Sequence, residues 1–264
     1  MRRLLFLFLV TSAVLFFGQR ADAATNIWVN DDALIYAPPG TSCNNAGYAT
    51  IQAAVNAAAA GDTVNVCPGT YTENVTIDKA NLKVVGTSAT SAVTIKAAIS
   101  SYVVLITQPN VTLDGFVIVP KGSGDPDIGV FVLIEGVASA ELSRNIIRGG
   151  RIGINLHCVS SGSTVDHNIV NGASEAGINV DTCEAPPFPG SNFNSVHHNT
   201  VCGGLFPYSI AIGGSSSFNE VHHNNAIWMF VGGTGNNVHD NTAEQFIILP
   251  GNISQNNTIA DVCP

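Results

Sequence analysis

A short pattern that ends in asparagine recurs six times in the second half of the chain. In each copy an aliphatic residue precedes two polar residues and then the asparagine. The asparagines follow one another at intervals of 23, 31, 25, 17 and 15 residues. This spacing favours a solenoid with one repeat per turn and loops of variable length, and it argues against an ordinary α/β fold. The six are Asn145, Asn168, Asn199, Asn224, Asn241 and Asn256.

Stacked parallel strands explain why such a pattern repeats. Equivalent residues in successive turns lie about 4.8 Å apart, so that like side chains form columns. We expect Val, Ile and Leu to point inward, and we expect each repeated asparagine to take the left-handed conformation of a corner and to bond to the next asparagine. Asn81–Gly86, Val93–Lys96 and Asn110–Ile118 read as earlier, less regular turns. The chain should hold about nine coils.

The first coil of a solenoid must be closed against water, since its apolar side chains and strand edge would otherwise be exposed. The segment from about 48 to 67 can supply this cap. Thr50 can N-cap an alanine-rich helix over Ile51–Ala60 that ends at Gly61, and Thr63–Val66 reads as the strand that follows. We expect the helix to pack across the end of the stack.

The N-terminus has the features of a signal peptide. Arg2 and Arg3 precede an apolar run over Leu4–Phe17, which is followed by the A-x-A sequence at 21–23. The run is shorter than the roughly 18 to 20 apolar residues of a membrane helix, and no later segment reaches that length. We therefore expect residues 24–264 to form a single domain that is secreted or periplasmic, without a membrane span and monomeric.

The charge balance is acidic. Without residues 1–23, which hold Arg2, Arg3, Arg20 and Asp22, the ten Lys and Arg become seven and the nineteen Asp and Glu become eighteen. The net charge near minus eleven makes nucleic acid a poor partner. No Lys or Arg follows Arg151, so the last 113 residues lack the fixed cations that bind phosphate or carboxylate groups.

Six cysteines lie in the exported part, and an even number in an oxidising compartment favours disulfides over free thiols. Cys43 and Cys67 flank the cap helix and are expected to pair. Cys158 and Cys183 follow the similar segments GINLHC and GINVDTC, one coil apart, and are the leading second pair. The sequence leaves the pairing of Cys202 and Cys263 open.

The segment Tyr48–Ile77 resembles the opening of pectin lyase-like β-helix proteins. Those proteins typically begin with T-I-Q-x-A-[VI], then G-D-x-V-x-V and then P-G-x-Y-x-E-x-[VL], and this chain has TIQAAV, GDTVNV and PGTYTENV in the same order. The resemblance implies an all-β, right-handed parallel β-helix. It does not imply one reaction, because the superfamily includes polysaccharide lyases, esterases, epimerases and hydrolases, phage tailspikes and copper-site maturation proteins.

One cluster of residues could carry polysaccharide chemistry. Calcium-dependent lyases hold the ion with several carboxylates and use an arginine as base. Asp125 and Asp127 lie in KGSGDPDIG, and Arg148 and Arg151 follow on the next turn. We expect these four to line one groove and to be the catalytic candidates, with calcium as a candidate cofactor. Solvated loop charges are the alternative. The segments typical of pectin esterases and polygalacturonases are absent.

Histidines repeat beside the asparagines. His167, His198 and His223 precede a repeated asparagine directly, and His197, His222 and His239 stand one position earlier in their repeats. Stacking should bring each set into a column. Two vertically adjacent imidazoles could share one copper or zinc ion. A polar outer face of neutral histidines is the alternative. In either case we expect crowding to lower the histidine pKa values and stability to fall at acid pH.

Two functions from different classes follow from these residues. The first is binding or modification of an extracellular polysaccharide on the side of the helix, by a lyase, epimerase or hydrolase if the protein is an enzyme. The second is a non-catalytic structural or metal-handling module with a histidine-rich face. Convergence of carboxylates and arginines in a groove lined with aromatic side chains would favour the first.

Overall fold

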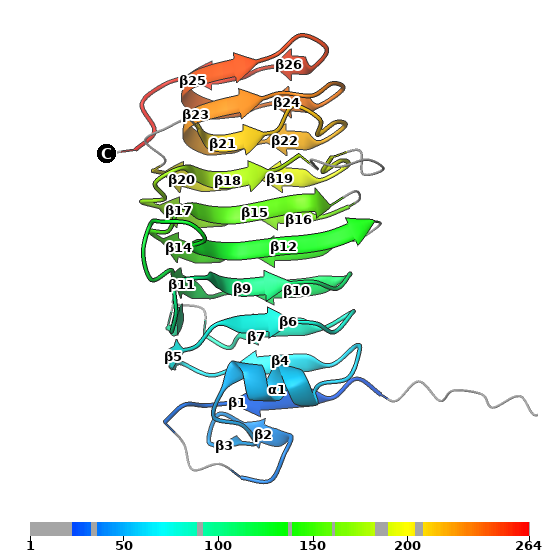
Figure 1. Cartoon of the computed structure of the whole chain (residues 1–264), viewed down its shortest axis with the longest axis vertical. Coiled ribbons are helices and arrows are strands. Elements are labelled where there is room, and N and C mark those ends of the chain that lie inside the picture. The colour runs from blue at the N-terminus through cyan, green and yellow to red at the C-terminus, as the bar shows by residue number, and fades with distance from the viewer. Residues whose placement is uncertain are drawn as a thin grey trace, which may run out of the picture.

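The computed structural model of the chain describes residues 23–32, 36–88, 92–136, 139–159, 162–182, 190–203 and 208–263. The expected signal peptide lies outside these residues, apart from Ala23. Within them, the strands form a single stack of parallel coils along the long axis of the molecule (Figure 1). No helix in this part of the chain is long and apolar enough to cross a membrane.

The first side of the stack is a ten-stranded parallel sheet, here the A face, with one strand from each turn. Ten turns are close to the number that the sequence predicts. The sheet runs in the order β1 (Asn26–Val29), β4 (Thr63–Val66), β7 (Lys83–Gly86), β10 (Val111–Asp114), β13 (Ala140–Ser143), β16 (Thr164–Asp166), β19 (Ser195–His197), β22 (Glu220–His222), β24 (Asn237–His239) and β26 (Ile253–Gln255).

Two further columns of strands belong to a fifteen-stranded sheet and meet at β23 (Asn225–Val231), which pairs with both. The short column holds β5 (Gly69–Thr72), β8 (Val93–Lys96), β11 (Val117–Val119), β14 (Ile146–Arg148), β17 (Ile169–Asn171) and β20 (Thr200–Cys202). The column of longer strands, here the C face, holds β6 (Val75–Ile77), β9 (Tyr102–Ile106), β12 (Ile128–Gly136), β15 (Ile152–Val159), β18 (Ala176–Val180) and β21 (Tyr208–Ile212). After β23 come β25 (Thr242–Ile248) and β27 (Thr258–Ile259).

The core follows from the two-residue period of the strands, because alternate side chains point into the coil. On the A face, Val165, Val196, Val221 and Val238 are all fully buried. Their pairing in register is direct, so each valine packs on the next. A continuous apolar core therefore runs along the stack, as the repeat pattern predicts.

The N-terminal end is closed by α1 (Ile51–Ala57) and by the hairpin of β2 (Gly40–Ser42) and β3 (Asn45–Ala46) (Figure 1). Thr50 accepts a hydrogen bond from the Ala53 amide, as predicted for an N-cap. Glu73 also accepts hydrogen bonds from the first two amides of the helix. The strand predicted at Thr63–Val66 is confirmed as β4.

The predicted helix was too long by three residues. Its last turn is closed at Ala58, whose amide bonds to the carbonyls of Ala54 and Val55 and whose own backbone is extended. Asp62 then accepts a hydrogen bond from the Ala59 amide, and Gly61 turns the chain with a positive φ of 94°. These contacts direct the chain into β4 before the alanine run can continue the helix.

The asparagine column is present and buried, but two details of its prediction were wrong. The left-handed conformation belongs to the residue before each asparagine of the column, as in His167, His198 and His223, whose φ values are 53°, 55° and 54°. Of the six predicted asparagines, only Asn256 has it, with a φ of 52°. In the last coil the column continues at Asn257, because Asn257 and not Asn256 accepts the hydrogen bonds of Asn241.

Each asparagine in the column bonds in the same direction. The backbone nitrogen and the side-chain Nδ2 atom of Asn199 both donate to the Asn224 Oδ1 atom, each at 3.0 Å. Nδ2 of Asn199 also donates to the Val165 carbonyl of the preceding coil. The asparagine side chains thus form hydrogen bonds with backbone groups that would have no partner at a sharp corner.

A second asparagine column stands at the other end of the A-face strands and was missed in the sequence. It contains Asn194, Asn219, Asn236 and Asn252, joined by the same pair of hydrogen bonds between neighbours. Ser163 continues it toward the N-terminus. The sequence does contain a pattern that identifies this column, because each member precedes an asparagine of the first column by five residues.

Candidate functional site

The loop between β11 and β12 carries the predicted acidic residues onto the side of the stack. Its Lys121 Nζ atom donates to the Ala98 carbonyl, and its Ser123 carbonyl accepts from Ser174 Oγ. The loop therefore spans several coils. These contacts fix Asp125 and Asp127 beside the long strands of the C face.

Arg151 forms ion pairs with two carboxylates at this loop. Its Nη2 atom lies 3.2 Å from Asp125 and its Nη1 atom lies 2.6 Å from Glu175. The Asp125 side chain is 81% exposed and that of Arg151 only 26%. The sequence prediction that Asp125 and Arg151 come together agrees with this geometry, whereas Glu175 was not foreseen.

Asp127 and Arg148 take different positions. Asp127 is buried, and its carboxylate accepts a 2.7 Å hydrogen bond from Ser100 Oγ. Its carbonyl accepts from the Arg151 amide. Arg148 ends β14, and its exposed side chain forms no hydrogen bond or ion pair with another described residue. The contacts thus join Asp125 to Arg151, give Asp127 a role in holding the loop, and leave Arg148 apart.

A hollow of about 180 Å³ lies next to this ion-pair cluster on the C face. We call it the Tyr208 hollow. Its wall includes Glu175 and Asn179 from the β18 side and the rings of Tyr208 and Phe230 from the next two strands. The two rings stack with centroids 4.6 Å apart. A carboxylate paired with arginine therefore borders an aromatic surface.

The outer residues of the C-face strands explain why the hollow forms there. In register, the outward positions are Phe131, Asn155, Asn179, Ala211 and Phe230. The small Ala211 side chain leaves space between the larger ones. Toward the N-terminal end, the outer face is filled instead by an apolar cluster of Ile128, Phe131, Ile152 and Ala176.

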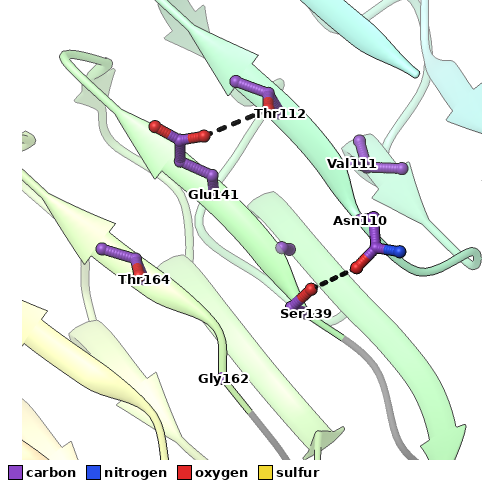
Figure 2. A pocket seen from close by; sticks show the side chains of 8 residues that line it. Asn110, Val111, Thr112, Ser139, Glu141, Gly162 and Thr164 are labelled. Atoms are coloured by element: carbon purple, nitrogen blue, oxygen red, sulfur yellow. Dashed lines mark hydrogen bonds between the residues drawn. The ribbon is translucent and has the colours of Figure 1, made fainter. Parts of the chain in front are cut away.

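A second hollow of about 320 Å³ lies on the A face over β10, β13 and β16 (Figure 2). Its polar groups are already paired with one another: Thr112 bonds to Glu141 and Ser139 bonds to Asn110. Figure 2 shows these pairs reaching across adjacent strands. Its lining contains no aromatic side chain, so it offers hydrogen bonds but no stacking surface.

Six histidines form an array farther along the A face. One column, at the last residue of the strands, runs from Asp166 through His197 and His222 to His239. The other column, one residue later, holds the predicted His167, His198 and His223 and ends at Asp240. Rings stack along each column with centroids 4.9 to 5.0 Å apart. Both predicted histidine columns are therefore present.

Each coil also joins its two columns through Nδ1. His197 and His198 have Nδ1 atoms 3.0 Å apart, and His222 and His223 have theirs 2.9 Å apart. At the two ends the partners are carboxylates, which lie 2.8 Å from the Nδ1 atoms of His167 and His239. Among the described residues, no group of three or more His, Cys, Asp or Glu is arranged as a ready metal site.

Burial and neighbouring histidines lower the pKa of three histidines in the array, in the expected direction. Burial, reinforced by repulsion from the charged forms of His197 and His239, lowers the pKa of His222 to about 4. Desolvation also lowers the pKa of His197 and of His198, with neighbouring histidines contributing further. Asp166 acts in the opposite direction on both. At neutral pH His197, His198 and His222 are therefore uncharged.

This gives a prediction for the pH dependence of stability. Below the ordinary histidine pKa of about 6.5, the unfolded chain takes up protons that His197, His198 and His222 do not take up in the folded protein, so the free energy of unfolding should fall between pH 6.5 and 5. We expect the melting temperature of the chelator-treated protein to drop across this range. A His197→Gln, His222→Gln variant should show a smaller drop, and His157→Gln the same drop as the unmodified protein. Equal slopes in all three would contradict the prediction.

The disulfides agree with the expected pairing where the structure describes both partners. Cys43 and Cys67 are bonded, as predicted. Cys158 is disulfide-bonded, while Cys183, its predicted partner, lies outside the described residues. Cys202 and Cys263, which the sequence left open, are bonded to each other.

No protein-family model matches the chain, and no curated protein matches its sequence. The structure is similar to an alginate lyase from Paenibacillus sp. str. FPU-7, with 12% identity and a TM-score of 0.62 over 83% of this chain and 76% of that one. It is also similar to XylC in complex with xylose, with 10% identity and a TM-score of 0.60 over 84% of this chain and 62% of that one. A pectin methylesterase from Aspergillus niger has 14% identity and a TM-score of 0.49 over 89% and 85% of the two chains. The fold is thus a right-handed parallel β-helix, as the opening segment of the sequence predicts.

Proposed function

We propose that the protein binds an extracellular polysaccharide in the Tyr208 hollow. The observation that carries this proposal is that Glu175 takes part in the ion pair with Arg151 and also lines a hollow with the stacked rings of Tyr208 and Phe230. Sugar rings present apolar C–H faces and polar hydroxyl edges. An aromatic surface bordered by carboxylate and amide groups matches both.

The charges favour a largely neutral glycan. Two carboxylates, Asp125 and Glu175, surround the one guanidinium of Arg151, so that the cluster has a net negative charge. No lysine or arginine follows Arg151 in the sequence to hold a uronate carboxylate. Hydroxyl groups, in contrast, can donate to the exposed Asp125 and Glu175 oxygens and can bond to the Asn179 amide.

Features typical of exported proteins and the similar solved structures support the same proposal. The two described disulfides and the signal-peptide pattern are typical of exported proteins. The similar solved structures include an alginate lyase and a protein in complex with xylose. Secretion or export to the periplasm is therefore part of the proposal.

The catalytic part of the expectation stays a prediction. If the protein modifies the glycan as a lyase, epimerase or hydrolase, Asp125, Arg151 and Glu175 are the groups best placed to act, because they border the hollow or pair at its edge. Asp127 holds the loop and Arg148 lies apart from the cluster. Reducing-sugar and unsaturated-uronate assays on a panel of neutral and acidic polysaccharides test this part separately from binding.

Binding is tested by affinity electrophoresis and calorimetry with neutral xylan, glucomannan and β-glucan and with acidic pectate and alginate. We expect at least one neutral glycan to bind, and Tyr208→Ser to weaken that binding at least about tenfold, because an aromatic side chain at the centre of a site typically contributes 2 kcal/mol or more. Glu175→Gln should weaken it less.

The matched control is Phe193→Asn. Phe193 is an exposed aromatic residue in the ring pair with Phe218, away from the hollow, and asparagine tolerates its positive φ of 57°. Its replacement should leave glycan binding unchanged. The proposal fails if Tyr208→Ser binds as well as the unmodified protein, or if the control loses binding equally.

A further inference from the structure

The histidine array contains four pairs of neighbouring side chains, one pair in each of four successive coils, and each pair joins two atoms that could bind a metal ion. The middle two pairs are His197 with His198 and His222 with His223, and both join two imidazole Nδ1 atoms. In each of them the two rings are nearly perpendicular, at 89° and 86°. Corresponding rings of the two pairs are nearly parallel.

Ring orientation decides which histidines could share an ion. The lone pair of an imidazole nitrogen lies in the plane of the ring, so an ion bound to it must lie close to that plane. His198 and His223 stack with only 5° between their planes and 4.9 Å between their centroids. An ion between these stacked rings would be out of plane for both. The vertical sharing considered from the sequence is therefore unfavourable, and the pair within one coil is the better chelate.

We propose that the His197–His198 and His222–His223 pairs are binding sites for copper(II). With metal–nitrogen distances of about 2.0 to 2.1 Å, two donors at right angles lie about 2.8 to 3.0 Å apart, whereas tetrahedral donors lie about 3.3 to 3.4 Å apart. The observed Nδ1 separations of 3.0 and 2.9 Å match the right angle of a square-planar or tetragonal ion.

The coordination chemistry also favours copper(II) over zinc and calcium. Neutral imidazoles suit copper, and copper(II) binds nitrogen donors more tightly than the other divalent first-row metals do. Calcium prefers oxygen ligands. For both nitrogens of a pair to bind the ion, each ring carries its proton on Nε2, which requires no change in net charge. Water occupies the remaining positions around the ion.

The backbone positions of the four histidines are fixed before any ion binds. His198 and His223 have the left-handed conformation of the corner, and the asparagine that follows each of them is fully buried in its column. His197 and His222 are paired in register within the A-face sheet. Only side-chain rotations remain to be fixed, so the entropic cost of assembling each pair is small.

Two neighbouring sites should interact. The ring spacing of 4.9 Å places two bound ions at about one strand separation from each other. Repulsion between two divalent ions at that distance should make the second equivalent bind more weakly than the first. At two equivalents, their proximity should broaden the copper electron paramagnetic resonance spectrum.

The experiment is a copper(II) titration of the chelator-treated full chain, purified without a polyhistidine tag, followed by calorimetry and electron paramagnetic resonance. We expect two equivalents, the second weaker, with nitrogen hyperfine structure and dipolar broadening when both are bound. Zinc should bind at least tenfold more weakly than copper. Glycan binding, measured in the same samples, is independent of this proposal, so that the two can fail separately.

Variants assign the site. His198→Asn should remove one equivalent, and the double variant His198→Asn, His223→Asn should lower copper affinity at least a hundredfold, since asparagine keeps the corner conformation and removes one nitrogen from each pair. His157→Gln, which removes a histidine that pairs with Asp181 elsewhere, should bind copper as before. Unchanged copper binding in the double variant, its loss in the control, or equal binding of zinc would overturn the proposal. Circular dichroism checks that each variant is folded.

Discussion

Replacing Asn224 by alanine should lower the free energy of unfolding by about 3 to 4 kcal/mol. Asn224 is fully buried, and its Oδ1 atom accepts hydrogen bonds from the backbone and side-chain nitrogens of Asn199. Its Nδ2 atom donates to the Val196 carbonyl and to Asn241. Alanine leaves the buried backbone N–H of Asn199 without a partner, which costs about 1 to 3 kcal/mol, and it removes three further hydrogen bonds that each contribute about 0.5 to 1.5 kcal/mol.

Urea unfolding followed by circular dichroism measures this change. Asn225→Ala is the matched control, because Asn225 is the next residue, belongs to the same coil and is exposed. It should change the free energy of unfolding by no more than about 0.5 kcal/mol. A loss below about 1 kcal/mol in Asn224→Ala would show that the column contributes little to stability.

Removal of the disulfide between Cys202 and Cys263 should have an effect of similar size. The bond closes a loop of 61 residues and ties the segment after β27 to β20, several coils back along the stack. Loop-closure entropy predicts a loss of about 4 kcal/mol in a Cys202→Ser, Cys263→Ser variant. Because the bond fastens the last coils, β25 and β27 should also exchange their amide hydrogens faster.

Hydrogen exchange separates this local effect from a general one. A Cys43→Ser, Cys67→Ser variant removes the disulfide at the other end, which closes a shorter loop. It should increase exchange near α1 and leave β25 and β27 protected. If both variants loosen the same strands, or if neither changes the protection of β25, the bond between Cys202 and Cys263 does not hold the C-terminal coils.

The fold could be predicted because one short sequence pattern marks a corner that recurs, with the same hydrogen-bonding requirement, in successive coils. The corner needs a buried side chain that accepts two hydrogen bonds from one coil and donates to a carbonyl, and asparagine meets this need repeatedly. The pattern fails at Asn256 because the last strand places Ser254 where the preceding coils have valine or leucine. The sequence pattern requires an aliphatic residue three positions before the asparagine. In the last coil Ile253 met this requirement, so the pattern assigned Asn256 to the column in place of Asn257.

The corner conformation was harder to assign. Asparagine is the residue most often associated with a positive φ, so the pattern suggested that the repeated asparagines adopt it. In the structure the positive φ belongs to the preceding residue, which is arginine, histidine, aspartate or, in the last coil, Asn256. The buried amide network fixes the asparagine, and the exposed neighbour accepts the unfavourable backbone.

The candidate glycan site could be predicted only in part. Asp125 and Arg151 were placed together because they lie on neighbouring turns of the sequence. Glu175, Tyr208 and Phe230 come from later coils, and the loops between coils differ in length, so the sequence alone does not show which residues become neighbours. The same limitation applies to the histidines: their columns follow from the repeat, but the pairing of Nδ1 atoms within a coil depends on ring rotations that no pattern encodes.

The two asparagine columns also determine where the chain can change in length. From Ser163 to Asn257 the two corner residues of each coil are always five residues apart. The separation from one coil to the next nevertheless ranges from 16 to 31 residues. All of this variation falls outside the five-residue segment, where doubling the length of a flexible loop costs only about 0.6 kcal/mol. The coil thus combines an invariant segment, which keeps the register, with loops that can accept insertions, and new side chains can be added at the loops without moving the strands.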